Sequence, residues 1–441
     1  MLGWFAAASA IVVASFADGG CKGNSSADPG MRICTPGNYV YCRCENRAEG
    51  TKLCLPDGNT FDVCKCDGTN PPDPDAGFTE IDSSTNPDSG DAGAPNDTAC
   101  IGKLFLLGGN AGGLYAASYK GAGKFTVVSK GGAGASIKGA PSIVPLASGG
   151  FGAVYRDAFD ALYATTFTGT FGTPVRIGAV TASDVPSLAA VSSDLHMIYR
   201  GGDGLHYHGT FTKGAWDDAT AAVTSASVHS FGPSSPTATL PTGDVLTIAY
   251  AGADQMLYRQ TFATGWTVAT AQADASISTV RPQLIALSDG THDLLVVYAS
   301  AGDYKLRSAA RDAKTKVWST PILIDPNAYT TDPVSIAPMK GGRAMLIYRG
   351  ANLKPYFSVY DPVASAAAPW SVLAELVTAA NPTVASSPAV AMGACGEDAV
   401  AVFAQDNGAV AIQRFVGGTW TLPAAVPGLL NFTDVGIAEH L

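Results

Sequence analysis

The chain contains 441 residues, of which 50 are glycine and 15% are charged, and its formal net charge is −10. Globular proteins average about 7% glycine and about 25% charged residues. This composition argues against coiled coils and helical bundles, whose exposed faces carry many Glu, Lys and Arg side chains. The negative charge is concentrated in residues 67–100, which contain eight acidic and no basic side chains. The rest of the chain is nearly neutral and has no basic stripe to neutralise phosphates, so we expect no nucleic-acid partner.

An uncharged apolar run opens the chain over residues 1–17 and ends in Ser15-Phe-Ala17. The run is too short for a membrane-spanning helix, and small residues at alternate positions are what signal peptidase accepts. We therefore predict a signal peptide at 1–17 and an exported protein, although no Lys or Arg precedes the run. The competing interpretation is a buried helix of the mature fold.

Nine cysteines fit an oxidising compartment outside the cell. Six of them lie close together and predict a disulfide-rich module over 21–66: Cys34, Cys42, Cys44, Cys54, Cys64 and Cys66. Spacing does not separate their possible pairings. A zinc site is the alternative, but the module has no histidine and export disfavours free thiolates. Cys100 and Cys395 remain as a long-range pair. Cys21 is a candidate for lipidation, which would be the only membrane attachment, although Asp18 stands where a lipobox has an apolar residue.

The run Cys34-Thr-Pro-Gly-Asn-Tyr-Val-Tyr-Cys42-Arg-Cys44, continued by Cys54-Leu-Pro-Asp-Gly and Cys64-Lys-Cys66, resembles cysteine-rich modules of surface lipoproteins of predatory Gram-negative soil bacteria. The resemblance implies a bacterial protein that is secreted or displayed on the outer cell surface, with or without a lipid anchor. Residues 67–99 follow with Pro, Gly, Ser and like charges, which cannot build a core. We expect a disordered acidic linker there. A calcium loop is the alternative, but the aspartates lack the spacing of an EF-hand.

A repeat fills the chain from residue 100 onward. Each unit begins with a proline followed by alternating apolar residues, 45 to 55 residues after the last: Pro141, Pro186, Pro236, Pro282, Pro333 and Pro388. An apolar run then ends in an aromatic residue: Tyr155, Tyr199, Tyr250, Tyr298, Tyr348 and Phe403. A second aromatic residue begins the last short extended segment: Phe171, Trp216, Trp266, Trp318, Trp370 and Trp420. Turn signals separate the segments, and no window has convincing helical periodicity.

Four short apolar segments per unit predict the four strands of a propeller blade. Six units are complete, and residues 101–130 read as three strands that lack a first one. Residues 432–440 read as a first strand without the rest. We therefore predict an all-β, seven-bladed β-propeller over 100–441, closed by pairing of the N- and C-terminal strands, which removes open sheet edges. Cys100 and Cys395 would then precede the second strands of adjacent blades, where a disulfide would lock the closure.

The unit Pro186-Ser-Leu-Ala-Ala-Val, Met197-Ile-Tyr-Arg-Gly-Gly-Asp-Gly-Leu-His-Tyr-His208 and Trp216 resembles the repeat of bacterial seven-bladed propeller lectins, in which an aromatic-Arg-Gly turn precedes a Leu-x-His strand and a tryptophan. The resemblance implies carbohydrate binding at several weak sites between blades, through aromatic stacking and hydrogen bonds. The ligand-binding residues it implies are Arg156, Tyr199, Arg200, His206, His208, Trp216 and Arg349. The arginine is replaced in other units by Ala251, Ala299 and Ala404, so only some sites would be competent. The alternative is structural: tryptophans packed between blades and arginines in salt bridges or along the surface.

Two other functions stay open at this stage. Sialidases and related glycosidases also use propellers, but they need placed carboxyl groups, and the chain has only three glutamates beyond residue 100 and no Ser-x-Asp-x-Gly-x-x-x-Trp box. A protein-interaction scaffold without catalysis is the third possibility. His196, His206 and His208 could share a blade face and meet a metal, but ordinary polar positions explain them as well. We therefore expect a monomeric lectin-like protein that binds glycans and has no catalytic residue, metal or cofactor.

Overall fold

The protein is described here by a computed structural model, which covers part of the chain. The described residues are 39–43, 49–53, 55, 60–62, 104–110, 113–119, 125–131, 137–146, 149–191, 194–212, 215–217, 237–239, 246–263, 265–363, 365, 368–376, 383–393, 397–430 and 434–439. The chain divides into two units, Met1–Ala92 and Gly93–Leu441. In the first unit, β1 (Tyr39–Arg43) and β2 (Glu49–Leu53) form an antiparallel two-stranded sheet.

Several predictions made from the sequence fall outside this description. The signal peptide at 1–17, the linker at 67–99 and the side chains of the cysteines are not among the described residues. The lipidation of Cys21, the disulfides of the 21–66 module and the Cys100–Cys395 pair therefore stay predictions. No helix formed by the described residues is long and apolar enough to cross a membrane.

The second unit is a ring of seven antiparallel sheets, each with four strands in simple up-and-down order, and one of them carries a fifth strand. We number them blades 1 to 7 and give their strands by position. First strands are β31 (Asp434–Glu439), β6 (Ser142–Pro145), β10 (Ser187–Val191), β14 (Thr237–Thr239), β18 (Gln283–Ala286), β22 (Ser335–Pro338) and β26 (Ala389–Met392). Second strands are β3 (Leu104–Asn110), β7 (Phe151–Arg156), β11 (Asp194–Arg200), β15 (Leu246–Ala251), β19 (His292–Ala299), β23 (Ala344–Arg349) and β27 (Ala399–Ala404).

The outer half of each blade consists of a longer third strand and a more variable fourth one. Third strands are β4 (Gly113–Tyr119), β8 (Ala161–Phe167), β12 (His206–Thr212), β16 (Met256–Phe262), β20 (Leu306–Asp312), β24 (Pro355–Tyr360) and β28 (Ala409–Val416). Fourth strands are β5 (Phe125–Gly131), β9 (Val175–Thr181), β13 (Ala215–Asp217), β17 (Thr270–Ser276), β21 (Ile322–Leu323), β25 (Ala374–Glu375) and β29 (Thr419–Trp420), and β30 (Ala424–Leu430) adds to blade 7. A short 3-10 turn, η2 (Lys340–Gly342), joins β22 to β23.

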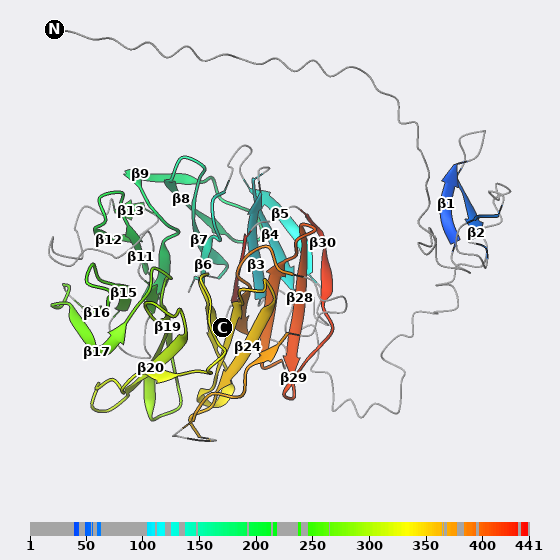
Figure 1. The fold of residues 1–441 in the computed structure, drawn as a ribbon. Coiled ribbons are helices and arrows are strands. Elements are labelled where there is room, and N and C mark those ends of the chain that lie inside the picture. The colour runs from blue at the N-terminus through cyan, green and yellow to red at the C-terminus, as the bar shows by residue number, and fades with distance from the viewer. Residues whose placement is uncertain are drawn as a thin grey trace, which may run out of the picture. The chain divides into compact units, whose positions relative to one another are not determined.

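The first strands surround the axis of the ring. Each one contacts the first strands of the two neighbouring blades, so that all seven form a closed circle. Figure 1 shows the same order by colour, from the cyan strands of blade 1 through green and yellow to the red strands of blade 7, which lie beside blade 1 again. The predicted fold class, an all-β seven-bladed propeller, is confirmed.

The two ends of the propeller chain meet in blade 1. The C-terminal strand β31 pairs with β3 in an antiparallel register that runs from Leu104 opposite Glu439 to Gly109 opposite Asp434. The outermost strand of blade 7, β30, also contacts β5 of blade 1. The predicted closure by the chain ends is therefore confirmed at the level of strand pairing.

Aromatic residues at the ends of the second strands form the core of most blades. All six predicted ones are almost fully buried: Tyr155, Tyr199, Tyr250, Tyr298, Tyr348 and Phe403. In four blades the tyrosine stacks on a tyrosine of the third strand at a centroid distance of 5.4 to 5.8 Å. The second strands are apolar on both sides because both faces of a blade pack against neighbouring blades.

Candidate functional site

Two of the predicted ligand-binding arginines converge on the loop between blades 2 and 3. The Nη1 atom of Arg156 donates hydrogen bonds to the carbonyl oxygens of Ala182, at 3.3 Å, and Ser183, at 2.5 Å. The Nη1 atom of Arg200 donates to the hydroxyl of Ser183 at 2.9 Å, and burial lowers the pKa of this guanidinium although Asp203 opposes the change. Both arginines therefore hold the connection from one blade to the next.

Arg349 repeats this arrangement in blade 6. Its Nη1 atom donates to the carbonyl oxygens of Val384, at 3.2 Å, and Ala385, at 2.8 Å, in the segment that leads into blade 7. Its Nε atom donates to Asp332 at 2.8 Å. The contacts match the structural alternative considered for these arginines. The guanidinium donates hydrogen bonds to carbonyl groups of the connecting backbone, which would otherwise have no donor there.

The predicted histidines of blade 3 lie at its contact with blade 4, whereas Tyr199 packs on the opposite face, against blade 2. Tyr199 and His206 are almost completely buried, and the His206 ring lies edge-on to Tyr250 at a centroid distance of 4.5 Å. His208 contacts His196 directly, with 2.7 Å between Nε2 of His208 and Nδ1 of His196. Burial, and secondly the neighbouring His196, lower the pKa of His208 to about 4. These side chains fill space between blades and are not gathered in an open cavity.

One position of the repeat decides how each boundary between blades is filled. It lies on the third strand, nine residues after the buried second-strand aromatic residue and ten in blade 5, and its side chain faces the second aromatic residue of the following blade. We call it the facing position. In blades 2 to 6 the facing residues are Ala164, His208, Arg259, Ser308 and Phe357.

Four of these residues cover the tryptophan of the next blade. The rings of His208 and Phe357 meet Trp266 and Trp420 edge-on, at centroid distances of 5.3 and 5.7 Å. The guanidinium carbon of Arg259 lies 4.6 Å from the ring centroid of Trp318, in a cation–π contact. The indole N–H of Trp370 donates to the Ser308 hydroxyl at 2.8 Å. The predicted packing role of the tryptophans between blades therefore describes these four.

Trp216 is different because its facing residue is Ala164. The alanine offers neither an aromatic ring nor a hydroxyl, and a cavity of about 460 Å³ lies beside the indole, between blades 2 and 3. We call this cavity the blade 2–3 cleft. Its walls are formed by Ala164, Thr165, Thr166, Gly172, Thr173, Val175, Arg176, Leu195, Phe211, Ala215 and Trp216. Among the seven predicted ligand-binding residues, only Trp216 lines this cleft.

The walls of the blade 2–3 cleft combine an aromatic surface with hydroxyl groups. Trp216 is half-buried and packs against Phe211 at a centroid distance of 5.3 Å. On the blade 2 side, Thr165 is turned away and donates to the carbonyl of Gly172 at 2.9 Å. Side chains alternate along a strand, so the neighbouring Thr166 points to the opposite face, toward blade 3. Arg176, on the exposed fourth strand, is the one charged residue among the described residues that line the cleft, and it pairs with Tyr163 across the strands.

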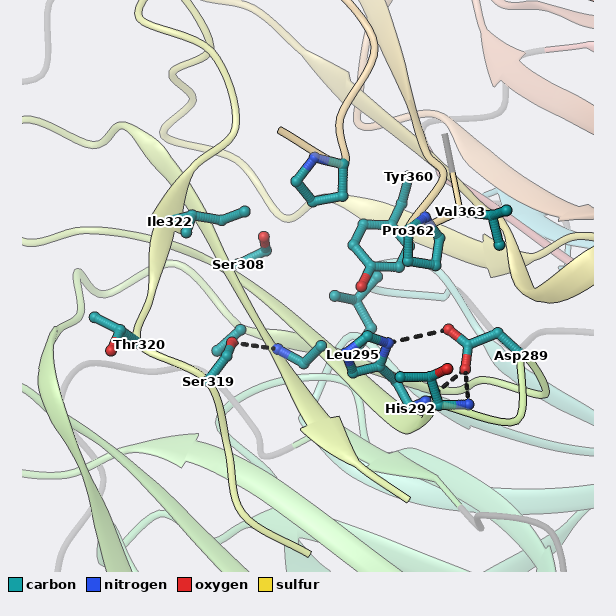
Figure 2. Close-up of a pocket in the computed structure, with 14 residues that line it drawn as sticks. Asp289, His292, Leu295, Ser308, Ser319, Thr320, Ile322, Tyr360, Pro362 and Val363 are labelled. Carbon is teal, nitrogen blue, oxygen red and sulfur yellow. Dashed lines mark hydrogen bonds and ion pairs between the residues drawn. The ribbon is translucent and has the colours of Figure 1, made fainter. Parts of the chain in front are cut away.

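The corresponding boundary between blades 5 and 6 contains a smaller cavity of about 240 Å³. Figure 2 shows that Ser308 and Ser319 lie on one side of it and Tyr360, Pro362 and Val363 on the other. Burial, and secondly the charge of Asp289, raise the pKa of Tyr360 to about 12. The Tyr360 phenol is therefore neutral at physiological pH.

A histidine held by an aspartate lies at the edge of this smaller cavity. The Nδ1 atom of His292 is 3.1 Å from Oδ2 of Asp289, as drawn in Figure 2. The other carboxylate oxygen accepts the backbone N–H groups of Thr291, at 2.6 Å, and His292. Gly342, at a φ of 75°, packs so closely that a Cβ atom there would lie 2.0 Å from the Asp289 Cβ atom. This backbone contact explains why the turn before β23 needs glycine.

No sequence motif pointed to Ala164, Thr166 or Arg176. The signal was present, because the facing position follows each second-strand aromatic residue at a nearly constant interval. When the facing residues of blades 2 to 6 are compared, Ala164 is the one alanine, and the others are larger or polar. The second aromatic residue of the unit that follows Ala164 is Trp216. Arg176 carries no such signal, since its position on the outermost strand varies between units.

No protein-family model matches this chain, and no curated protein matches it. Solved structures do match. A putative 6-phosphogluconolactonase from Bacteroides fragilis shares 14% identity, with 78% of this chain and 100% of that one covered, at a TM-score of 0.53. AofleA from Arthrobotrys oligospora shares 10% identity, with 69% and 90% covered, at a TM-score of 0.48. A fungal lectin from Aleuria aurantia, described as a six-bladed β-propeller with a novel fucose recognition mode, shares 14% identity, with 66% and 96% covered, at a TM-score of 0.45. At these identities the likeness extends to the propeller fold alone.

Proposed function

We propose that the protein is a lectin-like propeller that binds carbohydrate in the blade 2–3 cleft. The observation that carries the proposal is the uncovered indole of Trp216, which faces Ala164 where the other described blade tryptophans face a covering side chain. The smaller cavity between blades 5 and 6 is a second, weaker candidate. Export, supported by the apolar leader and the cysteine content, would bring such sites to glycans outside the cell.

The chemistry of the cleft suits a sugar ring. The C–H face of a pyranose is apolar and packs on an aromatic face, while its hydroxyls need hydrogen-bonding partners around the rim. Trp216 supplies the aromatic face, and Thr166 and Thr173 supply hydroxyl groups from blade 2. The volume of about 460 Å³ falls within the range of about 300–1,000 Å³ found for small-molecule sites.

A glycan array with the full chain tests this proposal, combined with variants that alter only the cleft. Trp216→Ala should abolish binding, and Ala164→Phe should do the same by placing a ring over the indole as Phe357 does in blade 6. Trp420→Ala is the matched control, since this tryptophan occupies the same repeat position under a covering ring. It should keep sugar binding.

Circular dichroism of each variant must show an intact fold for the comparison to count. Binding that survives both Trp216→Ala and Ala164→Phe in folded protein would remove the site from this cleft. A fluorogenic glycosidase panel on the same sample separates a lectin from an enzyme, because turnover of any glycoside contradicts a purely binding role.

A further inference from the structure

We call the smaller cavity between blades 5 and 6 the blade 5–6 cavity. We infer that it hydrolyses short-chain carboxylic esters, with His292 as the general base and the Tyr360 hydroxyl as the donor that stabilises the oxyanion. This activity is separate from carbohydrate binding in the blade 2–3 cleft and does not depend on it. It departs from the expectation, drawn from the sequence, of a chain without catalytic residues.

The strand register places His292 and Tyr360 on facing walls of this cavity. His292 pairs with Asp312, which lies four residues after Ser308 on β20, so the three side chains share one face of blade 5. This face packs on blade 6, because Ser308 accepts the indole N–H of Trp370. Tyr360 ends β24 of blade 6 and belongs to the apolar core that the two blades share. Each blade therefore contributes one of the two groups to the cavity.

Asp289 determines which nitrogen of His292 is free. A carboxylate only accepts hydrogen bonds, so the Nδ1 atom, 3.1 Å from Oδ2, carries the proton and Nε2 keeps its lone pair. Only 2% of the Asp289 side chain is exposed, against 25% of that of His292, and Gly342 of blade 6 packs against the aspartate. Nε2 has no hydrogen-bond partner among the described residues. A histidine fixed in one tautomer, with its second nitrogen free, can act as a general base.

Tyr360 supplies a hydrogen-bond donor at the same end of the cavity. Burial, and secondly the charge of Asp289, raise the pKa of its phenol to about 12, so the hydroxyl keeps its proton at neutral pH. Figure 2 shows this hydroxyl directed toward the end of the cavity where His292 and Asp289 lie. It donates to no other group within the described part of the chain. The O–H is therefore available to a negative charge that develops on a substrate oxygen.

The size and the apolar walls of the cavity suit a short acyl chain. Its volume of about 240 Å³ lies below the range of about 300–1,000 Å³ found for drug-sized ligands, so an acetyl or butyryl group fits and a long fatty chain does not. The apolar wall consists of Leu295, Ile322, Pro362, Val363 and Pro369.

The serines of the wall are not placed to act as nucleophiles. The Ser308 hydroxyl accepts the indole N–H of Trp370, and the Ser319 hydroxyl accepts the backbone N–H of Ala310 at 3.1 Å. Among the described residues, neither hydroxyl is hydrogen-bonded to His292. The nucleophile is therefore water.

The reaction consumes one ester and one water. Nε2 of His292 takes a proton from water while the water oxygen forms a bond to the acyl carbon. The carbonyl electron pair moves onto its oxygen, and this oxyanion accepts a hydrogen bond from Tyr360. The intermediate then breaks its bond to the alkoxide, which takes the proton from Nε2. The products are a carboxylic acid and an alcohol, while Asp289 stays ionised as a positioning residue.

Hydrolysis of p-nitrophenyl acetate and of triacetin by the full chain tests the inference. Triacetin, followed by titration at constant pH, is needed because activated aryl esters react with any exposed histidine. We expect saturable turnover of both esters. For p-nitrophenyl octanoate, kcat/KM should be lower than for the acetate by about tenfold or more, because the chain exceeds the cavity.

Variants assign the two catalytic roles. His292→Gln should lower kcat about 100-fold, and imidazole in the buffer should restore part of the activity of His292→Ala. Tyr360→Phe should also lower kcat about 100-fold and leave KM unchanged, because the oxyanion forms only in the reaction. Tyr329→Phe is the matched control, since it removes an exposed hydroxyl that does not line the cavity. It should change neither constant.

Asp289→Asn tests the positioning residue. The amide keeps an oxygen for the backbone N–H groups of Thr291 and His292, but its NH₂ group would donate to Nδ1 and move the imidazole proton to Nε2. We expect kcat to fall about 100-fold or more with KM and the thermal transition unchanged.

Three results would overturn the inference. The first is folded protein that does not hydrolyse triacetin. The second is turnover that survives His292→Gln. The third is a burst of p-nitrophenol with an acetyl group left on the protein, seen by mass spectrometry, because a side chain and not water would then be the nucleophile.

Discussion

His208 shows how a single facing residue can make the stability of the propeller depend on pH. Burial and His196 lower its pKa to about 4 in the folded protein, whereas a histidine in an unfolded chain has a pKa of about 6.5. Between these two values the unfolded chain binds more protons than the folded one. The free energy of unfolding is therefore fully maintained above about pH 6.5 and decreases as the pH falls toward 4.

We predict that His208→Leu flattens this part of the stability curve. The contribution of His208 should be about 1–2 kcal/mol, because the side chain is only partly buried and solvent screens the charge. Urea unfolding at pH 7 and pH 4.5 measures the difference for the native chain and the variant. His292→Leu is the control on another blade. The same loss of stability at pH 4.5 in the native chain and in His208→Leu would contradict the assignment.

Ser308 should be the most sensitive hydroxyl of the smaller cavity. Its oxygen accepts the buried indole N–H of Trp370 at 2.8 Å, so Ser308→Ala leaves that donor without a partner. We expect a loss of about 1–3 kcal/mol in the free energy of unfolding, measured by urea denaturation. Thr320→Ala, which removes an exposed hydroxyl from the same cavity, should cost less than about 0.5 kcal/mol. Equal losses for the two variants would show that the indole hydrogen bond adds little.

At this scale the repeat predicts the buried aromatic positions, whereas the ligand-binding residues stay predictions. The aromatic residues that end the second strands were recognisable because every unit needs one large side chain in the same buried place. The ligand-binding assignments for Arg156, Arg200 and Arg349 rested on residue type, and the structure places these side chains on backbone carbonyls or a hydroxyl of blade connections. Which tryptophan is left uncovered depends on a residue in the preceding blade, so it follows only after the register of the strands is known.

At the scale of elements, a buried carboxylate links the last blade to the first. Oε1 of Glu397, just before β27, accepts the hydroxyl of Tyr119 on β4 at 2.5 Å and the Nε–H of Arg414 on β28 at 2.9 Å. The Glu397 side chain is fully buried. Its neutralisation would leave Arg414 without its counter-charge at the boundary where the ring closes.

We predict that Glu397→Gln lowers the free energy of unfolding by about 3 kcal/mol, the lower end of the range for breaking a buried ion pair, because Arg414 is partly exposed. Glu375→Gln is the matched control. Its carboxylate pairs with Lys354 at 2.9 Å near the surface, where such pairs contribute up to about 1 kcal/mol. Guanidinium denaturation of the two variants should separate them clearly. Similar small losses would mean that the closure does not depend on this carboxylate.

The outer strands also show where reasoning from sequence stops. Each was predicted to begin at its aromatic residue, and Trp216 and Trp420 do lie in β13 and β29. Phe171, Trp266, Trp318 and Trp370 instead make a single bridge to the third strand, and the fourth strand follows. A fourth strand pairs on one side only, so side-chain packing of the aromatic residue overrides regular pairing there.

At the scale of the whole molecule, the period of the repeat and its two incomplete ends were sufficient to predict seven blades and their closure. Each blade buries both faces against its neighbours, so the number of units and the completion of the divided blade determine the architecture. The cleft could not be predicted in the same way. It results from one missing side chain at one boundary, and a repeat pattern reports what the units share and not where they differ.

Removal of β31 tests the closure directly. Deletion of residues 431–441 leaves β3 as an edge strand and exposes apolar side chains that β31 covers, such as Leu106. We expect the truncated chain to lose its single cooperative thermal transition and to form oligomers through the free edge, as seen by calorimetry and light scattering. Deletion of residues 1–92, which form a separate unit, is the control and should leave the transition of the propeller unchanged. A monomeric product of the first deletion with an unaltered transition would show that the ring does not require its C-terminal strand, because the contacts between first strands would then suffice to hold blade 1 in place.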